Sequence, residues 1–224
     1  MKLDLMILSL CSDKPIKESA SQIRGFFASQ FNEYILLHQH NAEKVIYEYP
    51  RVQYKVISEN QKKHAKAMII GINEGATVLK EIYDKFDTIN LNSNKYEIIE
   101  KGIAIKELNF GMSDNLIKYK FVTPYFALNQ KNYIKYNSLN HREKKQLLDK
   151  ILIGNILSMS KSLNYTIPDS IKSYTELKLR KSSLKGVPIA TFIGTFLINF
   201  EIPNLLGIGK SVSRGFGTVK QYEL

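Results

Sequence analysis

The chain has one cysteine, no tryptophan and no long apolar run in its 224 residues. A single cysteine, Cys11, can form neither an internal disulfide nor a thiolate-rich zinc site, which is typical of an intracellular protein. A membrane-spanning helix needs about 18 consecutive apolar residues, and no segment approaches that length. We therefore expect a cytoplasmic protein without a membrane partner.

Acidic residues are also scarce, but only in the second half. The whole chain has 32 Lys and Arg against 21 Asp and Glu, a net charge of +11. Residues 1–108 hold 15 basic and 14 acidic residues, a net +1, whereas residues 109–224 hold 17 and 7, a net +10. This excess favours a polyanionic partner such as nucleic acid, gripped mainly by the second half.

The first half has the hydrophobic pattern of one small α+β domain. Strands are expected at 2–10, 45–49, 52–56 and 68–72, helices at 16–34 and 74–86, and a last strand at 88–91 or 96–99. The order is β-α-β-β-α-β, which is that of a ferredoxin-like unit. We therefore place a ferredoxin-like domain at residues 1–108.

The second half predicts a similar unit with a long helix. Asn140 and Glu143 have the spacing of a capping box, and apolar residues follow at helical intervals to Leu163. Strands are expected at 116–121, 126–128, 174–181, 187–200 and 218–222. The fold class is thus α+β, with tandem ferredoxin-like (RRM-like) domains at 1–108 and 109–224.

The most specific string is glycine-rich and lies close to the C-terminus. It runs Gly207-Ile208-Gly209-Lys210-Ser211-Val212-Ser213-Arg214-Gly215-Phe216-Gly217. Glycine permits close backbone approach and positive φ, so a loop of this composition can bind phosphates through N–H groups and cations. We expect RNA-binding roles for Gly207, Gly209, Lys210, Ser211, Ser213, Arg214, Gly215, Phe216 and Gly217, and for the basic residues Lys178, Arg180 and Lys181 of the nearby hairpin.

Three known motifs fit this string less well. A Walker A loop needs glycine at Asn204, and a dinucleotide fingerprint needs glycine at Val212. An RNA-recognition motif expects aromatic residues where Thr218 and Gln221 stand, and too few residues follow for its last helix and strand. A plain turn before the last strand is the remaining structural interpretation.

The glycine-rich string consists of Gly-Ile-Gly, five further residues and Gly-Phe-Gly, and it lies near the end of a tandem α+β chain. It resembles the glycine-rich loop of CRISPR-associated RAMP-superfamily endoribonucleases, which cut repeat RNA into guide RNAs. Arg24-Gly25-Phe26-Phe27 is similar to the N-terminal pattern of that family. The resemblance implies metal-independent cleavage of CRISPR repeat RNA (pre-crRNA), leaving 2′,3′-cyclic phosphate and 5′-hydroxyl ends. It implies no cofactor, and as partners the repeat RNA and either a second copy of the chain or other CRISPR effector subunits.

Such chemistry needs a base for the 2′-hydroxyl, an acid for the departing 5′-oxygen and positive charge near the phosphate. His38 and His40 lie where this family carries its general base, and in an extended loop their i, i+2 spacing would turn both rings to one side. Either can be the base. Tyr34 and Tyr47 are candidate hydrogen-bond donors, and Lys44 is a candidate phosphate stabiliser.

Two alternatives stay open for this region. A metal site at His38 and His40 would need a further ligand such as Glu33 or Glu43, and we expect none. A non-catalytic RNA-binding subunit of the same double-ferredoxin type would use the basic half and the glycine-rich loop as a clamp.

Overall fold

A computed structural model describes residues 1–38, 40–41, 44–45, 48–58 and 65–222 and divides the chain into two compact units. The N-terminal unit consists of Lys2–Leu108 together with Val212–Gly215 of the glycine-rich loop. The C-terminal unit consists of Met1, Asn109–Ser211 and Phe216–Leu224. The glycine-rich loop therefore contributes its middle to one unit and its two ends to the other.

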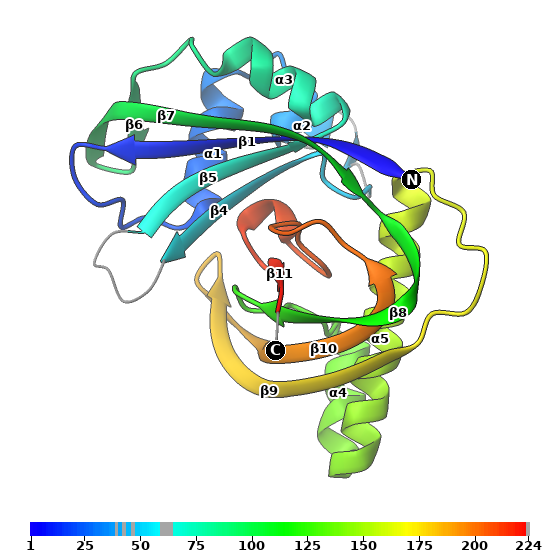
Figure 1. Ribbon diagram of the computed structural model, residues 1–224. Helices are drawn as coiled ribbons and strands as arrows, with labels where there is room; N and C mark the ends of the chain where they lie inside the picture. Colours follow the sequence, from blue (N-terminus) through cyan, green and yellow to red (C-terminus); the bar gives the residue numbers. More distant parts are fainter. Residues whose placement is uncertain (39, 42–43, 46–47, 59–64, 223–224) are drawn as a thin grey trace. The chain divides into compact units, whose positions relative to one another are not determined.

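The N-terminal unit has one antiparallel sheet in the order β4-β5-β1-β7-β6 (Figure 1). Its β1-β4-β5-β7 part has the ferredoxin-like strand order, with the first and third strands at the centre. Its strands are β1 (Lys2–Ser12), β4 (Val52–Ser58), β5 (Ala65–Ile72), β6 (Thr88–Leu91) and β7 (Asn94–Asn109), and its helices are α1 (Ala20–Gln30), α2 (Ile35–His38) and α3 (Glu74–Ile82). A separate pair is formed by β2 (His40–Asn41) and β3 (Lys44–Val45).

The core of this unit lies between the two longer helices and one face of the sheet. Ile23 and Phe27 of α1 and Leu79 of α3 are fully buried in one cluster with Leu8 of β1 and Tyr54 of β4. Burying a side chain of this size contributes about 1.5–3 kcal/mol, so this cluster is the main stabilising contact between helices and sheet.

The C-terminal unit has a four-stranded sheet in the order β11-β8-β10-β9, which is again the ferredoxin-like order. The elements are β8 (Gly111–Phe121), α4 (Gln130–Ser138), α5 (His141–Ser162), β9 (Ser173–Leu184), β10 (Val187–Glu201) and β11 (Val219–Gln221). The glycine-rich loop, with a 3-10 turn η1 (Val212–Arg214), occupies the place of the second helix between β10 and β11. The tandem ferredoxin-like prediction is confirmed.

Several local predictions are confirmed and others are wrong. The Asn140 capping box is present, with Asn140 Oδ1 accepting from the Glu143 N–H at 3.1 Å. Residues 126–128 are not a strand; Tyr125 alone forms a bridge with Phe192. The sequence also gave no signal for α4, because its nine residues bury none of their side chains and so show no apolar stripe.

The first predicted helix is shorter than expected, and the strand after it is described only in part. Helix α1 ends at Gln30 and a separate turn, α2, follows from Ile35. Within the expected strand at 45–49, Val45 lies in a strand and Glu48 and Tyr49 do not, while Ile46 and Tyr47 lie outside the described residues. Cys11 is an exposed free thiol near the end of β1. Across the helices that the structure describes, none has the length and apolarity to cross a membrane.

Candidate active site and glycine-rich loop

The ends of the glycine-rich loop are held in the C-terminal unit by backbone hydrogen bonds. The Ile208 N–H donates to the Gly217 carbonyl at 2.9 Å, and the Gly217 N–H donates to the Pro124 carbonyl at 2.8 Å. The Lys210 N–H donates to the Phe126 carbonyl at 2.9 Å. The two ends of the loop are therefore fixed by backbone contacts within the C-terminal unit.

Glycine is required here because the loop packs against its own unit. At Gly217, with φ +64°, an added Cβ would lie 1.9 Å from the Ile208 carbonyl oxygen. At Gly209, with φ +92°, it would lie 2.6 Å from the Tyr125 ring. These positions combine positive φ with close approach, so any side chain would be excluded.

Exposure divides the predicted RNA-binding residues of the loop. Lys210 is exposed, whereas Gly209, Ser211, Arg214, Gly215 and Phe216 are half-buried, and Gly207, Ser213 and Gly217 are buried. Direct contact with a ligand is therefore open to Lys210 and to the half-buried residues, while the buried glycines shape the loop. On β9, Lys178, Arg180 and Lys181 are all exposed.

The middle of the loop packs on β4 and α1 of the N-terminal unit. Lys55 Nζ donates to the Val212 carbonyl at 3.4 Å and to Gln53 Oε1 at 3.0 Å. An added Cβ on Gly215, with φ +90°, would lie 2.8 Å from Ala20 Cβ. Strand β4 and helix α1 thus form the surface on which the η1 turn packs.

Lys55 is an unusual residue in this surface because it is a fully buried lysine. Its side chain is 0% exposed, and this burial lowers the pKa of the Lys55 ammonium to about 7. The cause is desolvation, since removing a charged amine from water favours its neutral form. A buried amine here supplies a donor to the Val212 carbonyl of η1.

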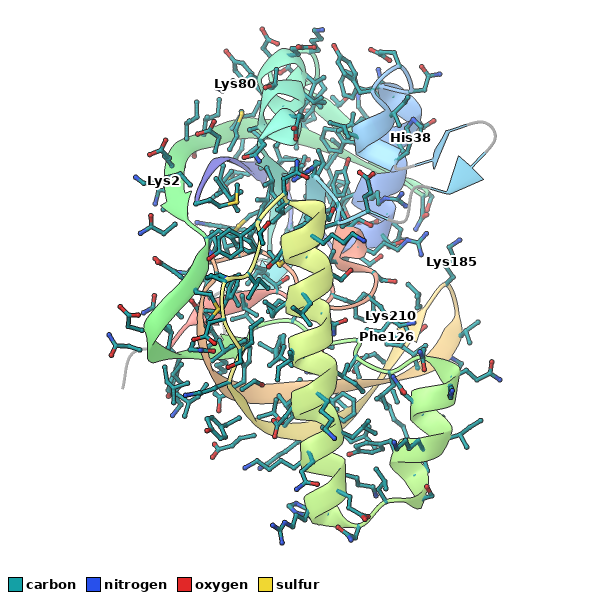
Figure 2. The ribbon with its side chains drawn as sticks, turned by 90° about the vertical axis from the view of Figure 1, so that its right-hand side faces the viewer. Lys2, His38, Lys80, Phe126, Lys185 and Lys210 are labelled. Atoms are coloured by element: carbon teal, nitrogen blue, oxygen red, sulfur yellow. The ribbon has the colours of Figure 1, made fainter. Side chains whose placement is uncertain are left out.

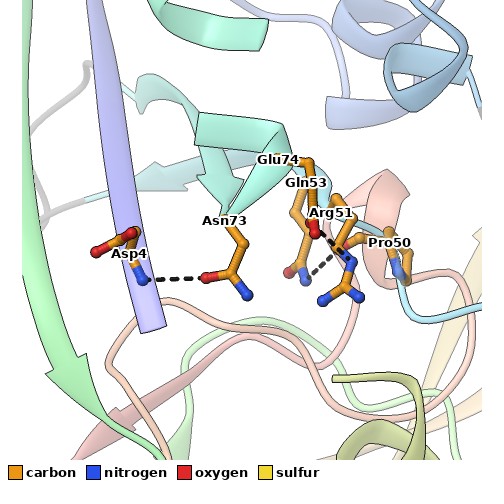
Figure 3. Close-up of polar contacts among 6 residues, drawn as sticks. All are labelled: Asp4, Pro50, Arg51, Gln53, Asn73 and Glu74. Atoms are coloured by element: carbon orange, nitrogen blue, oxygen red, sulfur yellow. Dashed lines mark hydrogen bonds and ion pairs between the residues drawn. The ribbon is translucent and has the colours of Figure 1, made fainter. Parts of the chain in front are cut away.

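The chain entering β4 is fixed by polar contacts at the start of α3 (Figure 3). Gln53 Nε2 donates to the Pro50 carbonyl at 3.3 Å, and Arg51 Nε lies 3.5 Å from Glu74 Oε2. On β1, which is separated from β4 by β5 in the sheet, the Asp4 N–H donates to Asn73 Oδ1 at 3.1 Å. Gln53 therefore joins Lys55 to this fixed entry.

His38 is the last residue of α2 (Figure 2), and the backbone at the end of this helix accepts two side-chain hydrogen bonds. The Arg24 guanidinium donates to the His38 carbonyl, and the Tyr54 hydroxyl donates to the Leu37 carbonyl at 3.3 Å. The ring Nε2 lies 3.2 Å from the Asn32 carbonyl. Because a carbonyl only accepts, Nε2 is the donor in this contact.

Arg24 and Arg214 bring two positive charges together in this unit. Burial lowers the pKa of Arg24, and the nearby Arg214 guanidinium lowers it further. Among the described residues, the buried Arg24 Nε has no hydrogen-bond partner. Like charges held together with an unused donor are stabilised by an anion, so the geometry beside His38 suits a phosphate.

The other predicted catalytic residues are placed less completely. His40 and Lys44 lie on the paired strands β2 and β3, and Tyr47 lies outside the described residues. Tyr34 is half-buried between α1 and α2, with Lys85 Nζ 5.9 Å from its ring centre. The alternation assumed for His38 and His40 does not apply, because His38 ends a helix.

Sequence reasoning missed the roles of Lys55 and Arg24 at this site. Arg24 carries a signal, since it opens the Arg24-Gly25-Phe26-Phe27 string, whereas Lys55 resembles any outward lysine of an alternating strand. In the part of the chain that the structure describes, no three His, Cys, Asp or Glu residues are grouped as metal ligands.

Comparison with known proteins assigns both halves to one family. The family models for the Cas6b N-terminal and C-terminal domains match residues 1–109 and 111–222. A crystal structure of Cas6b is 36% identical, with a TM-score of 0.90, covering 99% of this chain and 100% of that one. A crystal structure of the CRISPR RNA processing endoribonuclease Cas6b is 34% identical, with a TM-score of 0.79 over the same shares.

A curated relative and a more distant structure are also similar to this chain. The uncharacterized protein MJ0978 of Methanocaldococcus jannaschii is 44% identical over 147 residues, 64% of this chain and 98% of its own length. A Cas6 product complex shares the fold at 12% identity, with a TM-score of 0.62 over 98% of this chain and 99% of that one. With both halves matched and the fold shared along the whole length, the chain belongs to the Cas6b family of CRISPR RNA processing endoribonucleases.

Proposed function

We propose that this chain cleaves CRISPR repeat RNA without a metal ion, by attack of a 2′-hydroxyl on the adjacent phosphate. One observation carries the proposal: Arg24 holds the backbone of His38 and stands beside Arg214 of the glycine-rich loop. A proton acceptor and two cations thus belong to one compact unit. This is the set of groups that phosphate transesterification needs.

The proposed reaction replaces one bond at phosphorus by another and moves two protons. A histidine takes the 2′-hydroxyl proton, the O2′–P bond forms, and the P–O5′ bond breaks. A second group returns a proton to the 5′-oxygen, which leaves a 2′,3′-cyclic phosphate and a 5′-hydroxyl. His38 is the candidate base, His40 is the candidate acid, and Arg24 and Arg214 stabilise the phosphate charge. Tyr34, Tyr47 and Lys44 remain candidate donors to the same phosphate.

Cleavage of repeat RNA tests this mechanism directly. Wild-type cleavage should persist in EDTA and should stop when the nucleotide 5′ to the cut lacks its 2′-hydroxyl. His38→Ala plus His40→Ala should lower the single-turnover rate at saturating RNA by 100-fold or more, about the contribution of a lost acid–base pair. His141→Ala, at the exposed start of α5, is the matched control. Full activity of the double variant would refute the site.

The alternative is a non-catalytic RNA clamp. The net +10 of residues 109–224 favours salt-dependent binding whether or not the chain cuts. A clamp would bind repeat RNA with a steep salt slope and leave it intact under every condition. One cleavage assay with wild-type protein separates the two functions.

A further inference from the structure

The outer part of the β9–β10 hairpin has large apolar side chains that remain exposed. Strand β10 pairs with β8 from Thr195 to Glu201 and forms a bridge with Tyr125 at Phe192, so between Val187 and Thr191 its one backbone pairing partner among the described residues is β9. A two-stranded ribbon is marginally stable without packing on a face. Leu179 and Val187 of this ribbon are nevertheless 54% and 62% exposed.

This ribbon and the start of α4 enclose a pocket of about 830 Å³ in the C-terminal unit. Pockets of this size hold small molecules and cofactors, a class that includes nucleotides. One wall is the chain from Phe126 through the first turn of α4, which includes Tyr133. The other wall is the ribbon, with Leu179, Pro188 and Ala190.

The pocket is apolar inside and positively charged at its edge. Arg180 and Lys181 line it, and no acidic residue does so among those described. The N-terminus of α4 lies at the same wall of the pocket. Asn129 is its N-cap, and its first turn has no acidic residue. A helix N-terminus favours negative charge, so all the charge at the edge has one sign.

Phe126 connects the pocket to the glycine-rich loop. Lys210 Nζ lies 5.9 Å from the Phe126 ring centre, and the Phe216 ring centre lies 6.1 Å from it. Figure 2 shows Lys210 beside Phe126, and Lys185 at the turn of the hairpin. An RNA chain bound along Lys210 would therefore reach the pocket within the same unit.

We propose that this pocket seats one unpaired base of the bound RNA, stacked on Tyr133, with its flanking phosphates on Lys210, Arg180 and Lys181. Aromatic surfaces with cations nearby bind single-stranded bases in this way, and a rim whose charges are all positive suits a polyanionic chain such as RNA. The proposal rests on the proposed function in that it takes repeat RNA as the ligand.

An abasic scan of the RNA tests the pocket. The probe is repeat RNA with a 2′-deoxy nucleotide 5′ to the cut, which is not cleaved, and with one base removed at a time. At one position, loss of the base should weaken binding to wild-type protein about 5- to 100-fold, the range for a stacked base. With Tyr133→Ala that loss should shrink to less than twofold, since the base no longer has its stacking partner.

Tyr174→Ala is the matched control, because Tyr174 is a similarly exposed tyrosine on β9 that does not line the pocket. It should keep the wild-type pattern of abasic losses. Ala190→Phe, which fills the pocket instead of trimming it, should weaken binding of intact RNA while leaving RNA that already lacks the seated base unaffected.

Three results would overturn the proposal. One is an abasic pattern identical in Tyr133→Ala and wild type. Another is an unchanged RNA affinity for both pocket variants while sedimentation shows that they dissociate a dimer, since the pocket would then receive a second copy. The third is a wild-type chain that binds no repeat RNA, which overturns the proposed function as well. RNA bound but never cut overturns the catalytic proposal alone, and the abasic scan still decides the pocket.

Discussion

Replacing Lys55 by methionine should change how stability depends on pH. Burial lowers the pKa of Lys55 to about 7, from an ordinary value of 10.5. Between those two values the unfolded chain holds the proton and the folded chain does not, so the free energy of unfolding rises with pH. At about 1.4 kcal/mol per pH unit, burial of Lys55 costs about 4 kcal/mol at pH 7 and about 2 kcal/mol at pH 9.

Methionine removes this titration but also removes two hydrogen bonds. The Val212 carbonyl and Gln53 Oε1 each lose the Lys55 donor, although the Gly215 N–H still donates to the Val212 carbonyl at 3.1 Å. A lost hydrogen bond costs about 0.5–1.5 kcal/mol, so at pH 7 these losses offset part of the gain from removing a buried charge. The diagnostic quantity is therefore the change with pH: from pH 7 to pH 9, wild type should gain about 2 kcal/mol over Lys55→Met.

Urea unfolding followed by circular dichroism at pH 7, 8 and 9, at constant ionic strength, measures this difference. Lys80→Met is the control, because Lys80 is exposed on α3 and its replacement should leave the slope unchanged. If Lys55→Met and wild type gave parallel curves of stability against pH, Lys55 would not titrate as a buried amine, and its assigned place beneath η1 would be wrong.

Three further predictions concern single residues. Arg24→Lys keeps the charge but loses the planar fork that donates to the His38 carbonyl, so the single-turnover cleavage rate should fall roughly 10- to 100-fold, with RNA affinity changing less. Gly217→Ala should lower the stability measured by thermal denaturation by about 2 kcal/mol or more, whereas Gly154→Ala, inside α5 with no described atom within 4 Å of an added Cβ, should raise it by about 0.5–1 kcal/mol. Arg180→Ala should lower the slope of log affinity against log salt by about 0.7 and affect binding more than the chemical step, which filter binding and cleavage at saturating RNA can separate.

Local sequence patterns predicted the elements whose signals come from near neighbours. The apolar runs along β5 and β10 and the helical spacing in α3 and α5 were enough, because the buried residues of each element are near neighbours in the sequence. Helix α4 escaped detection because it buries no face. The apolar residues at 126–128 match the pattern of a strand, but they follow the Tyr125 bridge without pairing, and Phe126 and Leu128 line the pocket beside the β9–β10 hairpin.

The sequence by itself determined the tandem ferredoxin-like fold, the basic second half, the glycine-rich loop and the family. These follow from periodicity, charge and a short motif, which are properties of the linear sequence and do not depend on how the chain folds. Only the tertiary structure decided that His38 ends a helix held by Arg24, that Arg214 stands beside Arg24, and that Lys55 is buried under η1. Burial and the approach of distant charges depend on long-range packing, so Arg24 and Arg214 come near each other only when the chain has folded.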